Sequence, residues 1–337
     1  MSVTTQLSSY DSDLSGLVYG YVFSADGVGH LVDTAAAIAW LAKGEDRGGE
    51  FIWLHFNTQA TRTWMQQHLD LPEEFAEALK EGSRSTRIEQ ADQGLIAVVN
   101  DVVYDLLGGS LLQVATLWLN VRSRYLISVR KQPLRSVDKL REAVNRGELF
   151  HSPVALLIHL LHDQADVLVQ IMRDATDKVD GIEDNFLLGR LPKPGNLGGL
   201  RRDLVRLQRL LAPEPGALFR LLNHPPAWVG IEMAQELHQS TEEFSLVLRD
   251  MAGLQERIKL LQEEVVAHIG ERTNRSVFVL TAVTVIALPI NLSAGLLGMN
   301  VGGVPFSHDQ AGFWIVVALL LLITGLAAWL VLRLRDE

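Results

Sequence analysis

Two long runs without charged residues lie near the C-terminal end of the chain and dominate its hydrophobic pattern. The first extends from Val277 to Met299, and the second from Phe313 to Leu332. A helix rises about 1.5 Å per residue, so twenty-odd residues cross a hydrocarbon core of roughly 30 Å. Soluble helices rarely stay apolar on all sides over two consecutive stretches, which disfavours a buried pair of soluble helices. The sequence therefore predicts two transmembrane helices joined by a short loop.

The first run carries a stripe of polar and small positions at helical spacing. With Leu288 completing the series, its members are Thr281, Thr284, Leu288, Asn291 and Gly295. Polar side chains at membrane depth face other helices or a water-filled path. Two interpretations stay open: the stripe packs against neighbouring helices, or it lines a pore.

A long helix is expected to lead into the first run. It should begin near Ala227 or Trp228, after Pro225-Pro226, and continue into the membrane. Apolar residues at spacings of three and four predict a stripe buried against two other helices, 154–188 and 197–211. The members of this stripe are Phe244, Val247, Met251, Leu254, Ile258, Leu261 and Val265.

The same helix has a polar face opposite that stripe. At about 100° per residue, Glu256, Glu263, Asn274 and Thr281 project on roughly the side away from the apolar positions. This face either lines a funnel that concentrates cations through its field, or is an ordinary solvated helix face.

The first 150 residues mix strand and helix patterns and predict an α/β domain. Strands are expected over 17–24, 51–56, 95–107, 114–120 and 125–130, and helices over 58–69, 72–80 and 136–146. No phosphate loop, nucleophile elbow or dinucleotide fingerprint appears in this region. The chain is therefore not expected to be an enzyme.

The amino-acid composition limits the binding partners and metal ligands that the chain can use. Of 337 residues, 48% are hydrophobic, the net charge is -10, and cysteine is absent. An acidic chain argues against nucleic-acid binding. Without thiolates, any zinc ligand must be histidine, carboxylate, backbone oxygen or water, and such sites can be weak enough to release the ion.

Two histidine–carboxylate groups are candidates for metal binding. On the predicted helix 154–188, His159, His162, Asp163 and Asp166 stand at i, i+3, i+4 and i+7. They form either a regulatory zinc site or an ordinary polar or packing face. Between the membrane runs, His308 and Asp309 either attract zinc at a pore mouth or belong to a simple polar loop. His55, within a predicted strand, is expected to be a hydrogen-bonded core histidine.

The first run ends in Gly298-Met299-Asn300, some 37 residues before the C-terminal end of the sequence. A long helix that enters a membrane span, ends in Gly-Met-Asn and is followed by a final span resembles the CorA superfamily of divalent-cation transporters. The continuation GMNVGGVP, together with Trp53-Leu54-His55-Phe56-Asn57 and Ile182-Glu183-Asp184-Asn185, resembles its ZntB zinc-transporter branch.

The resemblance implies an α+β membrane protein that forms a CorA-like, funnel-shaped homopentamer in the lipid bilayer. Gly298, Met299 and Asn300 would form the outer ring of the pore, and Zn²⁺ would be the transported ion, with no tightly bound cofactor. Zinc uptake by Zn²⁺:H⁺ symport fits this branch, with zinc export as the alternative direction. The alternatives are a magnesium or general divalent-cation channel of the same fold, and a membrane-tethered metal sensor that moves no ion.

Basic residues near the membrane runs predict the orientation. Arg272 and Arg275 precede the first run, Arg333 and Arg335 follow the second, and the loop has no lysine or arginine. Both termini are therefore expected in the cytoplasm, and the resemblance implies the inner membrane of a bacterial cell. The expected segments are an α/β domain 1–150, a helical hairpin 151–226, a stalk helix 227–276, a pore-lining span 277–299, a periplasmic loop 300–312, a second span 313–332 and a cytosolic tail 333–337.

Overall fold

The computed structural model describes residues 12–43, 48–58, 61–69, 71–82, 86–91, 94–103, 113–192, 195–299 and 311–335. The chain divides into two compact units, Met1–Leu260 and Leu261–Glu337. The boundary falls inside one continuous helix, α9 (Ile231–Leu297).

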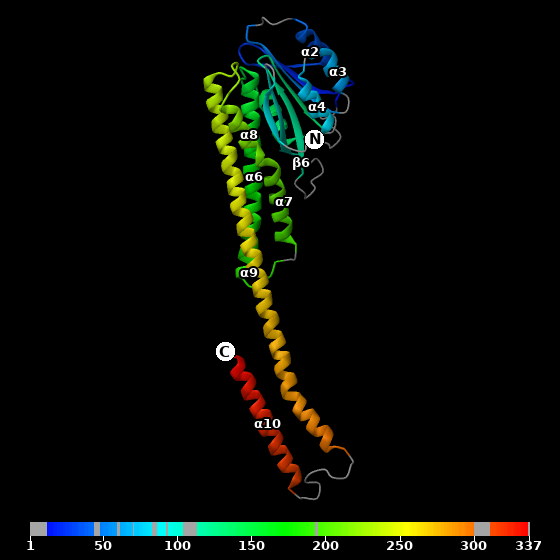
Figure 1. Cartoon of the computed structure of the whole chain (residues 1–337), viewed down its shortest axis with the longest axis vertical. Coiled ribbons are helices and arrows are strands. Elements are labelled where there is room, and N and C mark those ends of the chain that lie inside the picture. Colours follow the sequence, from blue (N-terminus) through cyan, green and yellow to red (C-terminus); the bar gives the residue numbers. More distant parts are fainter. Residues whose placement is uncertain are drawn as a thin grey trace. The chain divides into compact units, whose positions relative to one another are not determined.

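The first unit is built on a mixed β-sheet (Figure 1). Within the described residues it has seven strands in the order β2-β1-β3-β7-β6-β5-β4, and β3 and β7 are the parallel neighbours. The strands are β1 (Leu17–Phe23), β2 (Gly29–Val32), β3 (Phe51–Asn57), β4 (Arg87–Ala91), β5 (Gly94–Val102), β6 (Val114–Val121) and β7 (Tyr125–Arg130).

Helices cover both faces of the sheet, and the central strands are consequently apolar on both sides. On β3, Trp53 belongs to the core beneath one face, whereas Ile52 and Leu54 belong to the core beneath the other. The second face is covered by α2 (Thr34–Leu41), α3 (Thr61–His68) and α4 (Glu73–Glu81). The first is covered by α5 (Arg135–Asn145), α6 (Pro153–Leu187), α8 (Pro213–Leu222) and the start of α9.

Several short elements were not predicted from the sequence. β2 and β4 are too short to show a clear period, and α2 is apolar at almost every position and so shows none. Asp33 caps α2 by accepting a hydrogen bond from the Ala36 backbone N–H at 2.8 Å. The sequence predicts that Pro213 and Pro215 stop the helix over 197–211, and α7 (Asn196–Leu211) does end before them. Pro213 then opens α8, because its missing N–H and restricted φ suit a first helical turn.

Helix α9 starts later than predicted, at Ile231 instead of Ala227 or Trp228. A turn closed by the Val229 N–H and the Pro226 carbonyl at 2.9 Å occupies the residues before it. The predicted apolar stripe is confirmed with one correction. Leu248 is buried in the position expected for Val247, because a helix of 3.6 residues per turn drifts from a strict 3–4 count.

Contacts within the first unit confirm α6 and α7 as the neighbours of α9. The Ser240 hydroxyl lies 2.6 Å from His162 Nε2 on α6, and Gln208 Nε2 of α7 donates to the Leu248 carbonyl at 3.3 Å. Arg257 forms an ion pair with Asp180 of α6 at 2.7 Å. Because His162 meets Ser240 and Asp180 meets Arg257, α6 and α9 run parallel.

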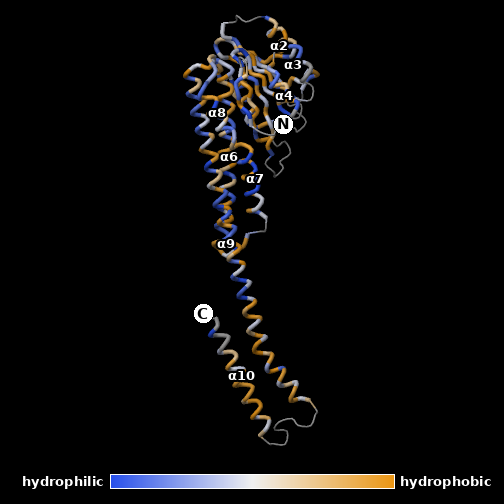
Figure 2. Tube along the Cα trace, viewed as in Figure 1, coloured by the Kyte–Doolittle hydropathy of each residue, from blue (hydrophilic) through white to orange (hydrophobic). Residues whose placement is uncertain are grey.

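The second unit contains the remainder of α9 and α10 (Gly312–Arg335). Three described helices are long and apolar enough to cross a membrane: α6, α9 and α10. The apolar stretch of α6 is 67% buried inside the chain, so α6 is a core helix. The corresponding stretches of α9 and α10 are 0% and 6% buried, and they contain the two runs predicted as spans (Figure 2).

Candidate functional site

The polar stripe of α9 lies on the surface of the single chain. Thr281, Thr284, Leu288, Asn291 and Gly295 are all exposed on a continuous helix. The Thr284 hydroxyl donates to the Leu280 carbonyl one turn back at 2.9 Å. A hydroxyl satisfied in this way can face lipid, a neighbouring helix or water without leaving a donor unpaired.

Large apolar side chains surround this stripe and are equally exposed. Leu280 is 69% exposed and Leu292 is 61% exposed on α9, while Phe313 and Trp314 on α10 are each 70% exposed. Contiguous apolar surface of this extent requires lipid or another protein surface to cover it. These two helices are therefore transmembrane helices.

The end of α9 explains the glycine of Gly298-Met299-Asn300. The Gly298 N–H donates to the Ala294 carbonyl at 2.9 Å, and the Met299 N–H reaches the Leu296 carbonyl at 3.4 Å. A β-carbon at position 298 would lie 2.9 Å from the Ala294 oxygen, closer than such contacts allow. Met299 is exposed. Asn300, His308 and Asp309 lie outside the described residues.

The predicted acidic face of α9 is exposed. Glu256, Glu263 and Asn274 all face away from the buried stripe. Glu256 accepts a hydrogen bond from Lys259 Nζ at 3.0 Å, one turn further along. The charge of this face is therefore partly neutralised at Glu256.

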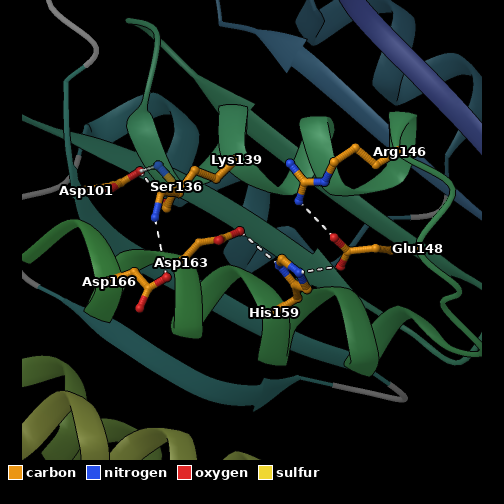
Figure 3. Close-up of polar contacts among 8 residues, drawn as sticks. All are labelled: Asp101, Ser136, Lys139, Arg146, Glu148, His159, Asp163 and Asp166. Atoms are coloured by element: carbon orange, nitrogen blue, oxygen red, sulfur yellow. Dashed lines mark hydrogen bonds and ion pairs between the residues drawn. The ribbon is translucent and has the colours of Figure 1, made fainter.

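On α6, the four predicted zinc ligands do not come together. His159 Nδ1 lies 2.9 Å from Asp163 Oδ2, and His159 Nε2 lies 3.1 Å from Glu148 Oε2 (Figure 3). Both ring nitrogens thus face carboxylate oxygens, so both must carry a proton to donate. The hydrogen bond to Asp163 is the main cause that raises the pKa of His159 above its ordinary value, and Glu148 acts in the same direction. An imidazolium has no lone pair left for zinc.

The other two members point to different neighbours. His162 meets Ser240 of α9, and Asp166 meets Lys139 of α5 at 3.5 Å. Among the residues that the structure describes, no group of three or more histidine, aspartate or glutamate side chains is placed to hold a metal ion. Spacing on one helix predicted proximity, but positions 159 and 162 differ by about 60° around the axis and meet different elements. Of the two interpretations left open by the sequence, these contacts match the ordinary polar face and not the four-residue zinc site.

His55 is the hydrogen-bonded core histidine that the sequence predicts. It is fully buried in β3, and Arg130 Nε donates to its Nε2 at 2.8 Å. Its Nδ1 therefore carries the proton and donates to the Ser128 hydroxyl at 2.7 Å. Burial lowers the pKa of His55 well below its ordinary value, and the Arg130 charge adds to this effect. Trp53 Nε1 donates to the same hydroxyl at 2.9 Å, so this part of the 53–57 motif serves the core.

Two buried carboxylates were not predicted, Asp101 on β5 and Glu214 on α8. The sequence did contain a signal for Asp101, because this acidic residue interrupts the apolar run of a central strand. Glu214 stands between Pro213 and Pro215 and resembled an ordinary turn residue. Only the fold shows that it turns inward.

Two exposed apolar helices, α10 and the last part of α9, define an integral membrane protein. The family model described as "CorA-like Mg2+ transporter protein" matches residues 48–333. The chain belongs to the CorA family of divalent-cation transporters, which are not enzymes.

Individual relatives agree with this assignment. The divalent cation transporter CmaX of Pseudomonas aeruginosa is 29% identical over 98% of this chain and 99% of its own. The structure of full-length CmaX matches with a TM-score of 0.82 at 26% identity, over 96% of this chain and 99% of that one. The zinc transport protein ZntB of Yersinia pseudotuberculosis is 23% identical over 92% of this chain and 93% of its own.

A further solved structure shares the fold alone. The CorA magnesium transporter of Methanocaldococcus jannaschii matches with a TM-score of 0.73 at 17% identity, covering 92% of this chain and 96% of that one. The predicted fold is therefore confirmed: an N-terminal α/β unit, a long stalk helix and C-terminal transmembrane helices. The superfamily is confirmed as well. Because the chain is similar to both CmaX and ZntB, the comparisons assign the superfamily and not the ZntB branch.

Proposed function

We propose that this protein moves Zn²⁺ across the bacterial inner membrane as a homopentamer, taking zinc up together with protons. The observation that carries the proposal is α9 itself. From Phe244 to Ile258 its buried stripe packs in the first unit, and its polar stripe lies on an apolar stretch that ends at Leu297, just before Gly298 and Met299. One such helix encloses no path, whereas a closed ring of subunits does.

In this ring, the stripe from Thr281 to Asn291 would contact the hydration water of the ion. Stripping a doubly charged ion of all its water is costly, so hydroxyl and amide groups that accept a hydrated ion are better suited to conduction. The ring of Asn300 side chains and nearby backbone oxygens would admit the ion from the outer side. Glu256 and Glu263 would face the inner funnel and attract cations.

Zinc is favoured by the ZntB relatives and by the local resemblance around Gly298-Met299-Asn300. A magnesium channel is the second candidate, because the family description and the CorA structure both name magnesium. Arginines precede the first membrane span and follow the second, and the loop between the spans has none, which supports cytoplasmic termini.

The purified protein in liposomes tests the proposal. Zinc flux should rise when an inward proton gradient is imposed, and excess Mg²⁺ should compete weakly. Asn300→Ala should lower zinc flux at least about tenfold, equivalent to ~1.4 kcal/mol of barrier, while the oligomer still assembles. Val301→Ala, one position further along, is the matched control and should transport normally.

Other outcomes would redirect the assignment. Magnesium flux without zinc flux would make the protein a magnesium channel. Metal binding without flux of either ion would make it a tethered sensor. Normal zinc flux in Asn300→Ala would remove that side chain from the pathway.

A further inference from the structure

Two carboxylates without access to solvent bond to groups at the end of β5 and on the helices packed beside it. Glu214, in the first turn of α8, is 0% exposed, and Asp101 of β5 is 1% exposed. Both lie in the first unit. Neither has a place in the ion path proposed above.

Glu214 ties α8 and α6 to the sheet. Its Oε1 accepts the backbone N–H of Asn100 at 2.6 Å, and its Oε2 accepts Gln164 Nε2 of α6 at 3.1 Å. Gln164 Nε2 also donates to the Asn100 carbonyl at 2.5 Å. The last residue pair in the β4–β5 ladder is Arg87–Val98. Asn100 lies beyond that pair, and its backbone N–H donates to Glu214.

Asp101 ties α5 to the same strand. It accepts the Val102 N–H at 2.7 Å, the Ser136 N–H at 3.2 Å and the Ser136 hydroxyl (Figure 3). Four elements, β5, α5, α6 and α8, therefore converge on two carboxyl groups. All five of these donors are uncharged.

The strongest charged influences on the pair are also acidic. Asp101 acts on Glu214, and Asp138 of α5 acts on Asp101. Two cations on the surrounding elements have acidic partners of their own: Arg87 pairs with Glu89 on β4 at 2.6 Å, and Lys139 of α5 pairs with Asp166. On α6, Asp163 lies next to Gln164 in the sequence and is hydrogen-bonded to His159. On α7, the Leu210 carbonyl accepts a hydrogen bond from Asn100 Nδ2 at 3.2 Å.

Burial without a cation favours the neutral acid. Burial raises the pKa of Glu214 well above its ordinary value, although the N–H of Asn100 opposes the shift. Burial also raises the pKa of Asp101 to about 6, against the hydrogen bonds from Ser136 and Val102. Because the two groups interact, their protons belong to the pair as a whole.

We propose that Glu214 and Asp101 form a proton-binding site that holds β5, α5, α6 and α8 together while it is protonated. Loss of the proton leaves two negative charges in a buried junction whose hydrogen-bond donors, within the described residues, are all uncharged. The junction between the sheet and the helices is then weakened. The ligand is the proton itself, so the site does not depend on which metal ion the protein carries.

The direction of the pH effect follows from the raised pKa values. The unfolded chain releases these protons near the ordinary carboxyl values of 4.5 and 3.8, whereas the folded chain keeps them to higher pH. The stabilisation is therefore complete below the unfolded values and is lost as pH rises through the folded values.

Infrared difference spectroscopy on the full-length protein in detergent tests the site directly. The wild type should show the C=O stretch of a protonated carboxylic acid near neutral pH, and the band should disappear on alkaline titration. Glu214→Gln should lack that band and should flatten the fall of thermal stability with pH. Glu232→Gln, an exposed acid in the first turn of α9, is the matched control and should change neither.

A wild-type spectrum without a protonated carboxyl band above about pH 6 would overturn the proposal. A band unchanged in a folded Glu214→Gln variant would overturn it too. If that variant does not fold, the wild-type titration and the milder Asp101→Asn variant still decide the question. None of these measurements requires transport, so failure here is distinguishable from failure of the zinc assignment.

Discussion

The two units of the chain differ in how far their apolar side chains are exposed. In Met1–Leu260, two hydrophobic cores lie under the two faces of one sheet, and side chains such as Trp53 and Phe244 are 1% exposed. In Leu261–Glu337, residues of the same kind are mostly exposed, as Leu280 and Phe313 show. The apolar side chains of the first unit are buried by contacts within one chain. The second unit exposes its apolar side chains, so it needs lipid or another protein surface to cover them.

Polar groups follow the same contrast. Buried polar side chains of the first unit, such as His55 and Glu214, have their partners inside it. On the membrane-spanning part of α9, the Thr284 hydroxyl bonds to its own helix, and the stripe to which it belongs stays exposed. The first unit thus uses polar groups to join elements, whereas the second presents them outward. That outward presentation is the property an ion path requires.

The largest expected effect tests whether α9 is held by packing in the first unit. Phe244→Ala removes a side chain that is 1% exposed and should lower the free energy of unfolding by about 3–5 kcal/mol, through lost burial and the cavity left behind. Thermal unfolding in detergent, followed by circular dichroism, measures the change.

Leu246→Ala is the matched control, two residues along the same helix. Leu246 is 53% exposed, so its truncation should change the free energy of unfolding by less than about 0.5 kcal/mol. Equal losses in the two variants would show that the assembled protein buries this outer face of α9 as deeply as the inner one.

A smaller effect separates the two interpretations of the polar stripe. Single cysteines at Thr281, Thr284 and Asn291 should react several times faster with a small, membrane-impermeant thiol reagent than cysteines at Val279, Val283 and Ile286. Water reaches a pore-lining face and not a lipid-facing one. The native chain has no cysteine, so the background is clean. Similar labelling of both sets would identify the stripe as helix-packing surface.

Much of this architecture could be predicted because its period is long and regular. The apolar stripe of α9 repeats over six turns, and the two membrane spans stay apolar over a longer stretch than soluble helices do. A local irregularity therefore does not hide either pattern. Short elements gave no such signal: β2 has four residues, and its exposed Leu31 hides the alternation. α8 was missed because Pro213 was interpreted as a stop and not as the start of a helix.

The candidate sites were harder because they depend on contacts between distant segments. His159 and Asp163 do pair along one helix, but Glu148 enters from the connection between α5 and α6 and makes the group an ion pair. His162 faces Ser240, 78 residues away. Spacing along one helix specifies which side chains share a face, and neighbouring elements decide what that face meets.

The smallest expected effect concerns this ion pair. His159 faces Glu148 and Asp163 at 3.1 and 2.9 Å, and its pKa is raised above the ordinary histidine value of 6.5. Its contribution to stability is therefore fully present below pH 6.5 and is lost as pH rises through the folded pKa. His159→Gln should destabilise the protein by about 1 kcal/mol under mildly acidic conditions, the size of one partly screened charged hydrogen bond, and much less at alkaline pH. Melting temperatures at both pH values measure the difference. His238→Gln is the control, because His238 is half exposed and its single carboxylate neighbour, Glu242, lies at 3.6 Å. If His159→Gln lowered the melting temperature equally at both pH values, the histidine would stabilise the fold by packing, and the imidazolium assigned from the two carboxylate contacts would be wrong.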